Sequence, residues 1–301
     1  MELNLFITFV VILMILYWLY LYRKIKVENF DNIKLPYHIW MYWENKEGNT
    51  KPTYLNLCYE SIIKNCGDKF KVHLLDEKNV HDYLPNLRKD LTSKLKKIPM
   101  KADYIRYQLL YHYGGIWLDS DIIVFRQLDN LLEQLKDHEY VGFGCHFNGQ
   151  VCTDKMDGYP KPANWAMISR EKSKLLGTMI KEADKMLDDN DTEYFSKNYH
   201  VMGRQLLWNC IDKLKKNDSD WDYLHASSKC VERDSKGHKV TNERTMSTED
   251  VDDRCENEIY FLPIYNTAPG FPKWFLNMSK KEILGSNILL SKYFKRALKE
   301  H

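Results

Sequence analysis

The stretch that most constrains the fold covers residues 101–125. It reads KADYIRYQLLYHYGGIWLDSDIIVF, which predicts an amphipathic helix, a Gly-Gly break and a short apolar strand. Asp119 and Asp121 follow that strand, and a second apolar run begins directly after them. Carboxylates beside buried strands are costly unless a cation or hydrogen bonds compensate them. The segment therefore predicts a divalent cation site or, as the alternative, a strand-end turn in which Asp119 caps a backbone amide.

The Asp-x-Asp spacing alone carries little information, because it recurs in polar surroundings. The other copies are Asp189/Asp191, Asp218/Asp220, Asp220/Asp222 and Asp250/Asp252. Only Asp119 and Asp121 lie between two apolar runs. Mg²⁺ and Mn²⁺ prefer such oxygen ligands and keep open positions that the phosphates of a substrate can fill. Context therefore makes this pair the candidate metal site.

Length and charge limit the class of partner. A chain of 301 residues can hold one large domain or two small ones, and 44 basic against 42 acidic residues give a net charge of only +2. Nucleic-acid binders usually carry a strongly basic face, so nucleic acid is not an expected partner. The basic run over residues 88–101 has two interpretations, a solvated helix face or an attraction for phosphates or an anionic membrane surface.

The N-terminus begins with an uncharged apolar segment over residues 3–22. Its length would span a bilayer as a helix, and aromatic residues crowd its C-terminal end as in an interfacial belt. A secretory signal peptide is the alternative, but the run is longer than an ordinary h-region and no A-x-A-like site follows. We therefore expect one transmembrane anchor with its flank over residues 1–24 and a polar stem over residues 25–35.

The remaining residues, 36–301, predict an α/β domain. Strands are expected over 37–43, 69–75, 140–143 and 165–169, and helices over 53–65, 100–113, 128–136, 171–187, 204–214 and 280–299, the last interrupted near Gly285. The β-α-β start suits a sheet with right-handed crossovers and a ligand site at the carboxyl ends of its strands. The charged segment 215–258 is expected to be an exposed insertion or a mobile loop.

Two segments, HIWMYWE and ADYIRYQLLYHYGGIWLDSD, resemble the glycosyltransferase 32-type family, which groups capsular polysaccharide synthesis and Och1-like proteins around a sugar-binding region containing DXD. The resemblance is good over residues 36–125 and extends over 140–210. It implies a GT-A fold, that is, a Rossmann-like nucleotide-diphospho-sugar transferase domain. It also implies Mn²⁺ or Mg²⁺ as cofactor, a nucleoside-diphosphate sugar donor, a glycan or glycoconjugate acceptor, and retention of anomeric configuration.

The resemblance implies roles for the residues around the Asp-x-Asp pair. Asp121 would bind the metal directly, and Asp119 would hold donor hydroxyls and contact the metal through water. Asp103 and Arg106 share one helix face and would lie against the donor sugar, with Arg106 also near the phosphates. Asp119, Asp121 and Arg106 are thus the candidate catalytic residues. The structural alternative for Asp103 and Arg106 is an ion pair on the helix surface.

Four further positions would contact the donor by the same resemblance. Trp40 would stack on the base, with Trp43 as the second choice. Tyr107 would approach the donor. Asn164 matches a family position at which the chain comes back to the donor sugar. Core packing is the alternative for the two tryptophans and for Tyr107. If the enzyme inverted instead, it would need a base to deprotonate the acceptor, for which Asp154 and Asp157 are the candidates.

The chain departs from the family pattern at two places. Gly203 matches a Gly-Pro turn before a helix, but Arg204 replaces the proline. Many relatives also carry a late His-containing motif ending in Ser-Trp, of which this chain has no clean copy. His200, Asn266 and Ser286 are the candidates for that third protein contact to the metal, which stays open.

Two other functions compete with this interpretation. In a phosphohydrolase of the haloacid-dehalogenase pattern, Asp119 would be the nucleophile and Asp121 the acid, although Ile122 and Ile123 do not match the residues expected there. The non-enzymatic alternative is a membrane-anchored binding or scaffold protein with a degenerate transferase fold, which the missing late motif motivates.

Two predictions compete for the side of the membrane on which the domain lies. Basic residues at 23, 24 and 26 follow the apolar span, and the positive-inside rule then places the domain in the cytosol. Family analogy places it in a Golgi-like lumen. Seven cysteines do not decide between the two, because an odd number leaves at least one unpaired in either compartment.

Overall fold

The chain forms two compact units, residues 1–35 and 36–301. The computed structural model describes residues 11–18, 34–45, 48–147, 150–151, 161–218, 220–226, 242–250, 260–264 and 271–299. In the first unit, residues 11–18 are helical. Within the described ranges no helix is both long and apolar enough to cross a bilayer. Most of the span expected over 3–22 lies outside those ranges, so the anchor stays a prediction.

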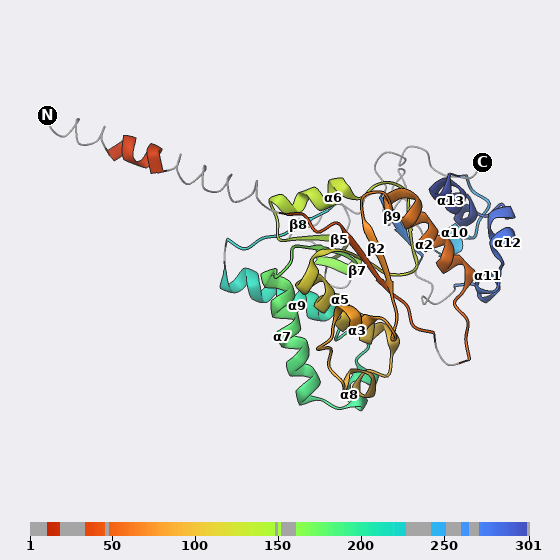
Figure 1. Ribbon diagram of the computed structural model, residues 1–301, viewed down its shortest axis with the longest axis horizontal. Helices are drawn as coiled ribbons and strands as arrows, with labels where there is room; N and C mark the ends of the chain where they lie inside the picture. Colours follow the sequence, from red (N-terminus) through yellow and green to blue (C-terminus); the bar gives the residue numbers. More distant parts are fainter. Residues whose placement is uncertain are drawn as a thin grey trace. The chain divides into compact units, whose positions relative to one another are not determined.

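A mixed β-sheet, with both parallel and antiparallel strand pairs, forms the centre of the second unit (Figure 1). Among the described residues its strands are β1 His38–Tyr42, β2 Lys71–Leu75, β3 Gly115–Leu118, β5 Tyr140–Phe147, β6 Gln150–Val151, β7 Lys161–Ser169 and β8 Leu224–His225. The order is β2-β1-β3-β7-β5-β6, with β8 paired to β5. Strands β1, β2 and β3 are parallel, whereas β7 is antiparallel to β3 and β5. The carboxyl ends of β1, β2 and β3 therefore meet at one edge.

A second, two-stranded sheet pairs β4 Ile122–Val124 with β9 Phe261–Pro263 in antiparallel fashion. The apolar run after the Asp-x-Asp pair therefore leaves the main sheet. Asp119 and Asp121 lie in the turn between β3 and β4, where the chain passes from one sheet to the other. Sequence alone predicted the two apolar runs but not that they belong to different sheets.

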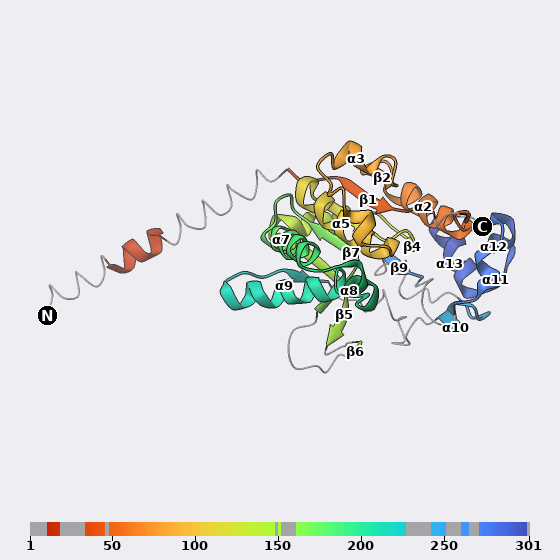
Figure 2. The same ribbon diagram turned by 90° about the horizontal axis from the view of Figure 1, so that it is seen from below.

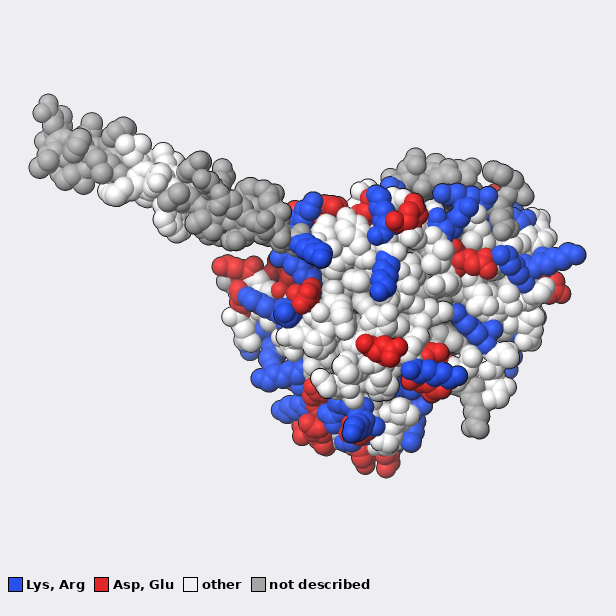
Figure 3. Space-filling view, viewed as in Figure 1, with Lys and Arg blue, Asp and Glu red and all other residues white. Residues whose placement is uncertain are grey.

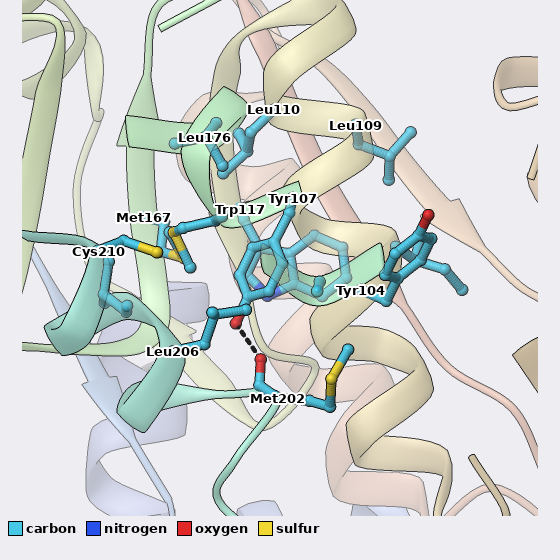
Figure 4. Close-up of a cluster of buried hydrophobic side chains, with 14 of the residues drawn as sticks. Tyr104, Tyr107, Leu109, Leu110, Trp117, Met167, Leu176, Met202, Leu206 and Cys210 are labelled. Carbon is cyan, nitrogen blue, oxygen red and sulfur yellow. Dashed lines mark hydrogen bonds between the residues drawn. The ribbon is translucent and has the colours of Figure 1, made fainter. Parts of the chain in front are cut away.

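Three long helices, α5 Ile98–Tyr113, α7 Lys174–Asp189 and α9 Arg204–Asn217, pack on one another and on the main sheet (Figures 1 and 2). Their apolar faces enclose the core that contains Trp117, Met167 and Leu176, part of which Figure 4 shows. Helices α2 Thr53–Cys66 and α13 Leu289–Leu298 pack on β4 to form a second core. The short elements are α3 Val80–Tyr83, α4 Leu91–Lys94, α6 Asp129–Glu133, a 3₁₀ turn Gln134–Lys136, α8 Thr192–Lys197, α10 Asn242–Thr245, α11 Lys273–Leu276 and α12 Lys280–Gly285.

The reversal from α5 into β3 depends on the two glycines that the sequence analysis took as a helix-to-strand break. Pro99 lies in the first turn of α5, where its missing N–H costs no helical hydrogen bond. Gly114 and Gly115 both have positive φ, +62° and +101°. A Cβ on Gly115 would also lie 2.6 Å from the carbonyl oxygen of His38. Only glycine therefore allows β3 to pair with β1 directly after the helix.

The expected elements agree with the structure in most places, and one segment differs. The helix expected over 280–299 is divided after Gly285 into α12 and α13, as its interruption predicted. The segment 215–258 is not wholly an exposed insertion, because Trp221 and Tyr223 are buried and β8 joins the main sheet. Figure 3 shows acidic and basic side chains intermixed over one face of the molecule, as expected for a net charge near zero.

Candidate active site

The turn after α5 brings the middle of this helix level with the end of β3. Arg106 lies seven residues before the last residue of α5, roughly 10 Å along a helix. Asp119 lies four residues after Gly115, roughly 13 Å along an extended chain that runs back in the opposite direction. Local geometry alone therefore places Arg106 beside Asp119.

Arg106 holds two carboxylates together. Its Nη1 donates to Oδ1 of Asp103 at 2.8 Å, and its Nη2 donates to Oδ1 of Asp119 at 2.7 Å. The guanidinium carbon lies 4.8 Å from the ring centroid of Trp117, a cation–π contact. Only 3% of the Arg106 side chain is exposed. The alternative of a surface ion pair between Asp103 and Arg106 is therefore wrong.

Trp117, the third residue of β3, is a further member of this network. Its Nε1 donates to the same Oδ1 of Asp119, at 2.8 Å. The available signal was the period of a strand, since residues two apart share one face and Trp117 precedes Asp119 by two. Oδ1 of Asp119 thus accepts two hydrogen bonds, while the side chain as a whole stays 36% exposed. Asp119 is held firmly and still faces outward.

Asn164 on β7 joins the network from the neighbouring strand. Its Nδ2 donates to Oδ1 of Asp103 at 2.8 Å. Gly203 lies against both residues: a Cβ there would lie 2.7 Å from Oδ2 of Asp103 and 2.9 Å from Nδ2 of Asn164. These two contacts leave no space for a side chain at position 203. The structure thus brings together Asp103, Arg106, Asp119 and Asn164.

Replacing Gly203 with alanine is expected to lower the free energy of unfolding by about 2 kcal/mol, because the added methyl group overpacks a buried ion network. Urea denaturation would measure the change. Gly285→Ala is the matched control, since no atom lies within 4 Å of its added Cβ. A Gly203→Ala variant as stable as the control would show that the network has room to move.

Asp121 is held through the backbone of its turn. The carbonyl oxygen of Asp121 accepts from the N–H of Ile264 at 3.0 Å, and the hydroxyl of Ser120 donates to the carbonyl oxygen of Tyr42 at 3.0 Å. These bonds tie the turn to β9 and to the carboxyl end of β1. Asp121 itself is half-buried. The two carboxylates of the Asp-x-Asp pair therefore flank one fixed point at the sheet edge.

The electrostatics of the site follow from burial and from Arg106. Burial raises the pKa of Asp103 to about 7, against the lowering effect of Arg106. Burial also raises the pKa of Asp119, while Arg106 and the hydrogen bond from Trp117 oppose the rise. Burial disfavours the charged form of Arg106, but Asp119 and Asp103 together raise its pKa above the ordinary value. Arg106 is the buried cation that offsets these carboxylates.

The residues fit a divalent cation that is shared with a substrate. Asp119 and Asp121 are hard oxygen donors at an accessible edge, as Mg²⁺ and Mn²⁺ prefer. Among the described residues, no group of three or more His, Cys, Asp and Glu side chains could hold a metal by itself. Phosphates and water would therefore complete the coordination, as in sites that bind Mg²⁺ with one or two carboxylates. Of the candidates for a third protein contact, His200 is exposed, Ser286 follows α12, and Asn266 lies outside the described residues.

The prediction that Trp40 stacks on a base is wrong. Trp40 is fully buried, and its Nε1 donates to the carbonyl oxygen of Gly114 at 2.9 Å. Its ring stacks on His73 with centroids 4.0 Å apart and also contacts Tyr83 and Tyr113. The core occupies the ring and its N–H, so no face of Trp40 is left for a ligand.

Tyr107 is likewise a core residue and does not approach a donor. It is fully buried, and its hydroxyl donates to the carbonyl oxygen of Met202 at 2.6 Å (Figure 4). A longer contact of 3.3 Å reaches the carbonyl oxygen of Gly203. Tyr107 therefore holds the turn before α9 against α5, which is how Gly203 comes to lie on Asp103.

Trp43, the second choice, has the placement that Trp40 lacks. It follows β1 directly, is half-buried, and its backbone N–H donates to the carbonyl oxygen of Leu75 at 2.9 Å. Its Nε1 donates to Oδ1 of Asn45 in an exposed hydrogen bond of 2.8 Å. Trp43 therefore presents an aromatic ring at the carboxyl edge of β1 and β2.

The basic run over 88–101 is not a simple solvated face. Arg88 forms ion pairs with Asp90 and Asp188, both at 2.8 Å. Lys101 is buried and forms an ion pair with Glu44, the residue after Trp43. The ends of the run thus serve internal contacts. Asp154 and Asp157, the candidate bases of an inverting mechanism, lie outside the described residues.

Comparison with known proteins gives a family and distant relatives. A family model described as capsular polysaccharide synthesis protein matches residues 19–230. Glycosyltransferase afumC of Aspergillus fumigatus is 30% identical over 107 residues, which cover 31% of this chain and 27% of that protein. HOC1, a candidate glycosyltransferase of Saccharomyces cerevisiae, is 29% identical over 108 residues, which cover 35% and 27%. The chain thus matches only about a quarter of the length of these relatives.

Two solved structures are similar at low identity. PaToxG glycosyltransferase has a TM-score of 0.44 and 11% identity, and the match covers 66% of this chain and 80% of that one. The apo form of glycosyltransferase GlyE from Streptococcus pneumoniae has a TM-score of 0.41 and 13% identity, and the match covers 87% and 64%. These TM-scores are too low for either likeness to carry a conclusion.

Proposed function

We propose that this chain, which belongs to the capsular polysaccharide synthesis protein family, is a divalent-metal-dependent glycosyltransferase with a GT-A fold. It would move a sugar from a nucleoside-diphosphate sugar to a glycan or glycoconjugate acceptor, with retention of configuration. One observation carries the proposal: Arg106 joins Asp103 to Asp119 beside Asp121, at the carboxyl edge of parallel strands. That edge is where α/β sheets bind their ligands.

Transfer breaks the bond between the anomeric carbon and the diphosphate and forms a bond to an acceptor oxygen, whose proton would pass to the leaving diphosphate. The leaving diphosphate gains negative charge, so groups that neutralise it lower the barrier. Asp121 and Asp119 would hold Mn²⁺ or Mg²⁺, which supplies Lewis-acid stabilisation of that charge. Arg106 would add a fixed positive charge nearby. Asp103 and Asn164 would act as positioning residues, because Asp103 accepts from both Arg106 and Asn164.

The donor base would stack on Trp43, because its half-buried ring lies at the ends of β1 and β2. Trp43→Ala is expected to weaken the binding of the nucleoside diphosphate by about tenfold to a hundredfold, as base–aromatic stacking contributes on the order of 1–3 kcal/mol. Calorimetric titration with UDP and GDP would measure the change. A Trp40→Phe variant serves as the control, since buried Trp40 should affect stability rather than nucleotide affinity.

The uncharged segment over 3–22 would anchor the enzyme in a membrane. Residues 25–35 would connect this anchor to the domain. Proteolysis of closed vesicles would show whether the domain faces the cytosol, as the positive-inside count predicts, or a lumen, as family analogy predicts. A chain that extracts from membranes without detergent would contradict the anchor.

The direct test of the activity is a panel of UDP- and GDP-sugars incubated with the full-length chain and Mn²⁺. Release of the nucleoside diphosphate from one donor would establish the reaction class and identify the sugar. The anomeric configuration of the product, measured by NMR, would decide between retention and inversion. No donor binding and no release across the panel would favour the non-catalytic scaffold instead.

A further inference from the structure

The turn between α8 and α9, residues 198–203, is fixed to the candidate site. Tyr107 binds its carbonyl groups from α5, and Gly203 at its end packs on Asp103 and Asn164. Two hydrogen bonds lie within the turn. The N–H of Val201 donates to the carbonyl oxygen of Asn198 at 3.2 Å, and the N–H of Gly203 donates to the carbonyl oxygen of His200 at 3.2 Å. Whatever this turn presents to solvent therefore keeps a defined position beside the site.

Tyr199 is the aromatic side chain that this turn presents, and 39% of it is exposed. The ammonium group of Lys97, at the start of α5, lies 5.2 Å from the centroid of the Tyr199 ring. That ammonium group also donates to the carbonyl oxygen of Ser196 at 2.8 Å. The ring of His200 lies edge-on, with centroids 5.0 Å apart. The Tyr199 ring is thus contacted by Lys97, which is itself bonded to α8, and by His200, while part of the ring stays open.

The charges of the candidate site act on the Tyr199 hydroxyl. Burial raises the pKa of Tyr199, the carboxylates of Asp103, Asp119 and Asp121 raise it further, and Arg106 opposes them. The turn that carries Tyr199 ends at Gly203, which lies against Asp103 and Asn164. At neutral pH the hydroxyl keeps its proton and can donate a hydrogen bond.

A partly open aromatic ring on a turn that packs against Asp103 has the chemistry that a sugar requires. The apolar C–H face of a pyranose packs on the ring, and its hydroxyls bond to the carboxylates and to the phenol. We propose that Tyr199 binds the sugar moiety of the donor and so helps to select which sugar is transferred. This proposal rests on the proposed function. Nothing in the sequence of the run Asn198–Gly203 shows that it folds against α5, so Tyr199 carries no local signal.

Comparing a nucleotide with its sugar derivative isolates this contact. The full-length chain, with Mn²⁺, is titrated by calorimetry with UDP and GDP and with UDP-glucose, UDP-galactose, UDP-N-acetylglucosamine and GDP-mannose. For the sugar nucleotide that the unaltered chain binds, Tyr199→Ala is expected to weaken affinity about tenfold and to leave affinity for the matching nucleoside diphosphate within about twofold. Tyr199→Phe keeps the ring and should lose less. Trp274→Ala, which removes another exposed aromatic, on α11, is the control and should change neither.

Each other outcome overturns the proposal. Equal weakening of nucleotide and sugar nucleotide would mean that Tyr199 acts on the nucleotide or on the fold, and thermal melting of the variant separates those two cases. Unchanged affinity for the sugar nucleotide would exclude a donor-sugar contact, even if transfer to an acceptor falls. If the unaltered chain binds no nucleotide at all, the proposed function itself fails, a result that the variants are not needed to reveal.

Discussion

Asp121→Ala is expected to lower the rate of glycosyl transfer by about 10³-fold or more. The substitution removes the carboxylate that would hold the metal, so the metal would no longer stabilise the negative charge that develops on the departing diphosphate. The fold should tolerate the change, because the turn is held by backbone and Ser120 contacts rather than by the Asp121 carboxylate alone. Nucleoside diphosphate release at increasing Mn²⁺ would measure the loss. Added metal should not restore the variant.

Asp189→Ala is the matched control for that substitution. Asp189 belongs to another Asp-x-Asp copy, is exposed, and lies at the end of α7. Its removal should leave both transfer and Mn²⁺ dependence unchanged. Full activity of the Asp121→Ala variant, with an unaltered requirement for metal, would move the metal site away from the turn between β3 and β4.

Arg106→Ala should damage both stability and activity. The side chain is 3% exposed and is paired with Asp103 and Asp119, so its removal leaves buried Asp103 and partly exposed Asp119 without their cation. Breaking a buried ion network from one side typically costs about 3–5 kcal/mol. We expect a loss of about 3 kcal/mol in the free energy of unfolding and a further fall of about 10²-fold in transfer by the folded fraction.

Denaturant unfolding and transfer assays on the same preparation separate the two effects. Arg88→Ala is the control, because Arg88 is also paired with aspartates, but its three partners, Asp90, Asp184 and Asp188, are exposed, and exposed ion pairs contribute at most about 1 kcal/mol. If Arg106→Ala were as mild as Arg88→Ala in both measurements, the network would not organise the site. A loss of stability with full residual transfer would make Arg106 a structural residue only.

The stability of this network should also depend on pH. The folded pKa of Asp103 is raised to about 7 from an ordinary value near 3.8, so the folded state holds a proton that the unfolded chain releases. This contribution is fully present below about pH 4 and is lost as pH rises toward 7. An Asp103→Asn variant should reduce that slope in a plot of unfolding free energy against pH and leave the part that Asp119 contributes. If the slope is unchanged in the variant, the pH dependence of stability comes from other titratable groups.

The contacts of Arg106 with Asp103 and Asp119 depend on local order in the chain. Asp103 and Arg106 are three apart on one helix, and Asp119 follows a short strand after a glycine turn. Helix rise, strand rise and a tight reversal are enough to bring them together. The motif also predicted the family, which the family model over residues 19–230 confirms.

Local order could not rank the two tryptophans of the first strand. The run from His38 to Trp43 is apolar or aromatic throughout, so its alternation does not show which ring the helices cover. The layer formed by α3 and α5 buries Trp40, and the end of the strand leaves Trp43 half-exposed. Which aromatic is available to a ligand is therefore a property of packing.

The sequence by itself determined the α/β class, the family, and the Asp-x-Asp centre with Arg106 and Asp103, because those features depend on residue types and on spacings within one helix and one strand. Only the tertiary structure decided that Gly203 closes on Asp103, that Tyr107 is a core hydroxyl, and that Tyr199 stands beside the site. Those contacts join residues about 100 positions apart in the chain. No local spacing encodes them, since they arise when α5, α7 and α9 pack together over the sheet.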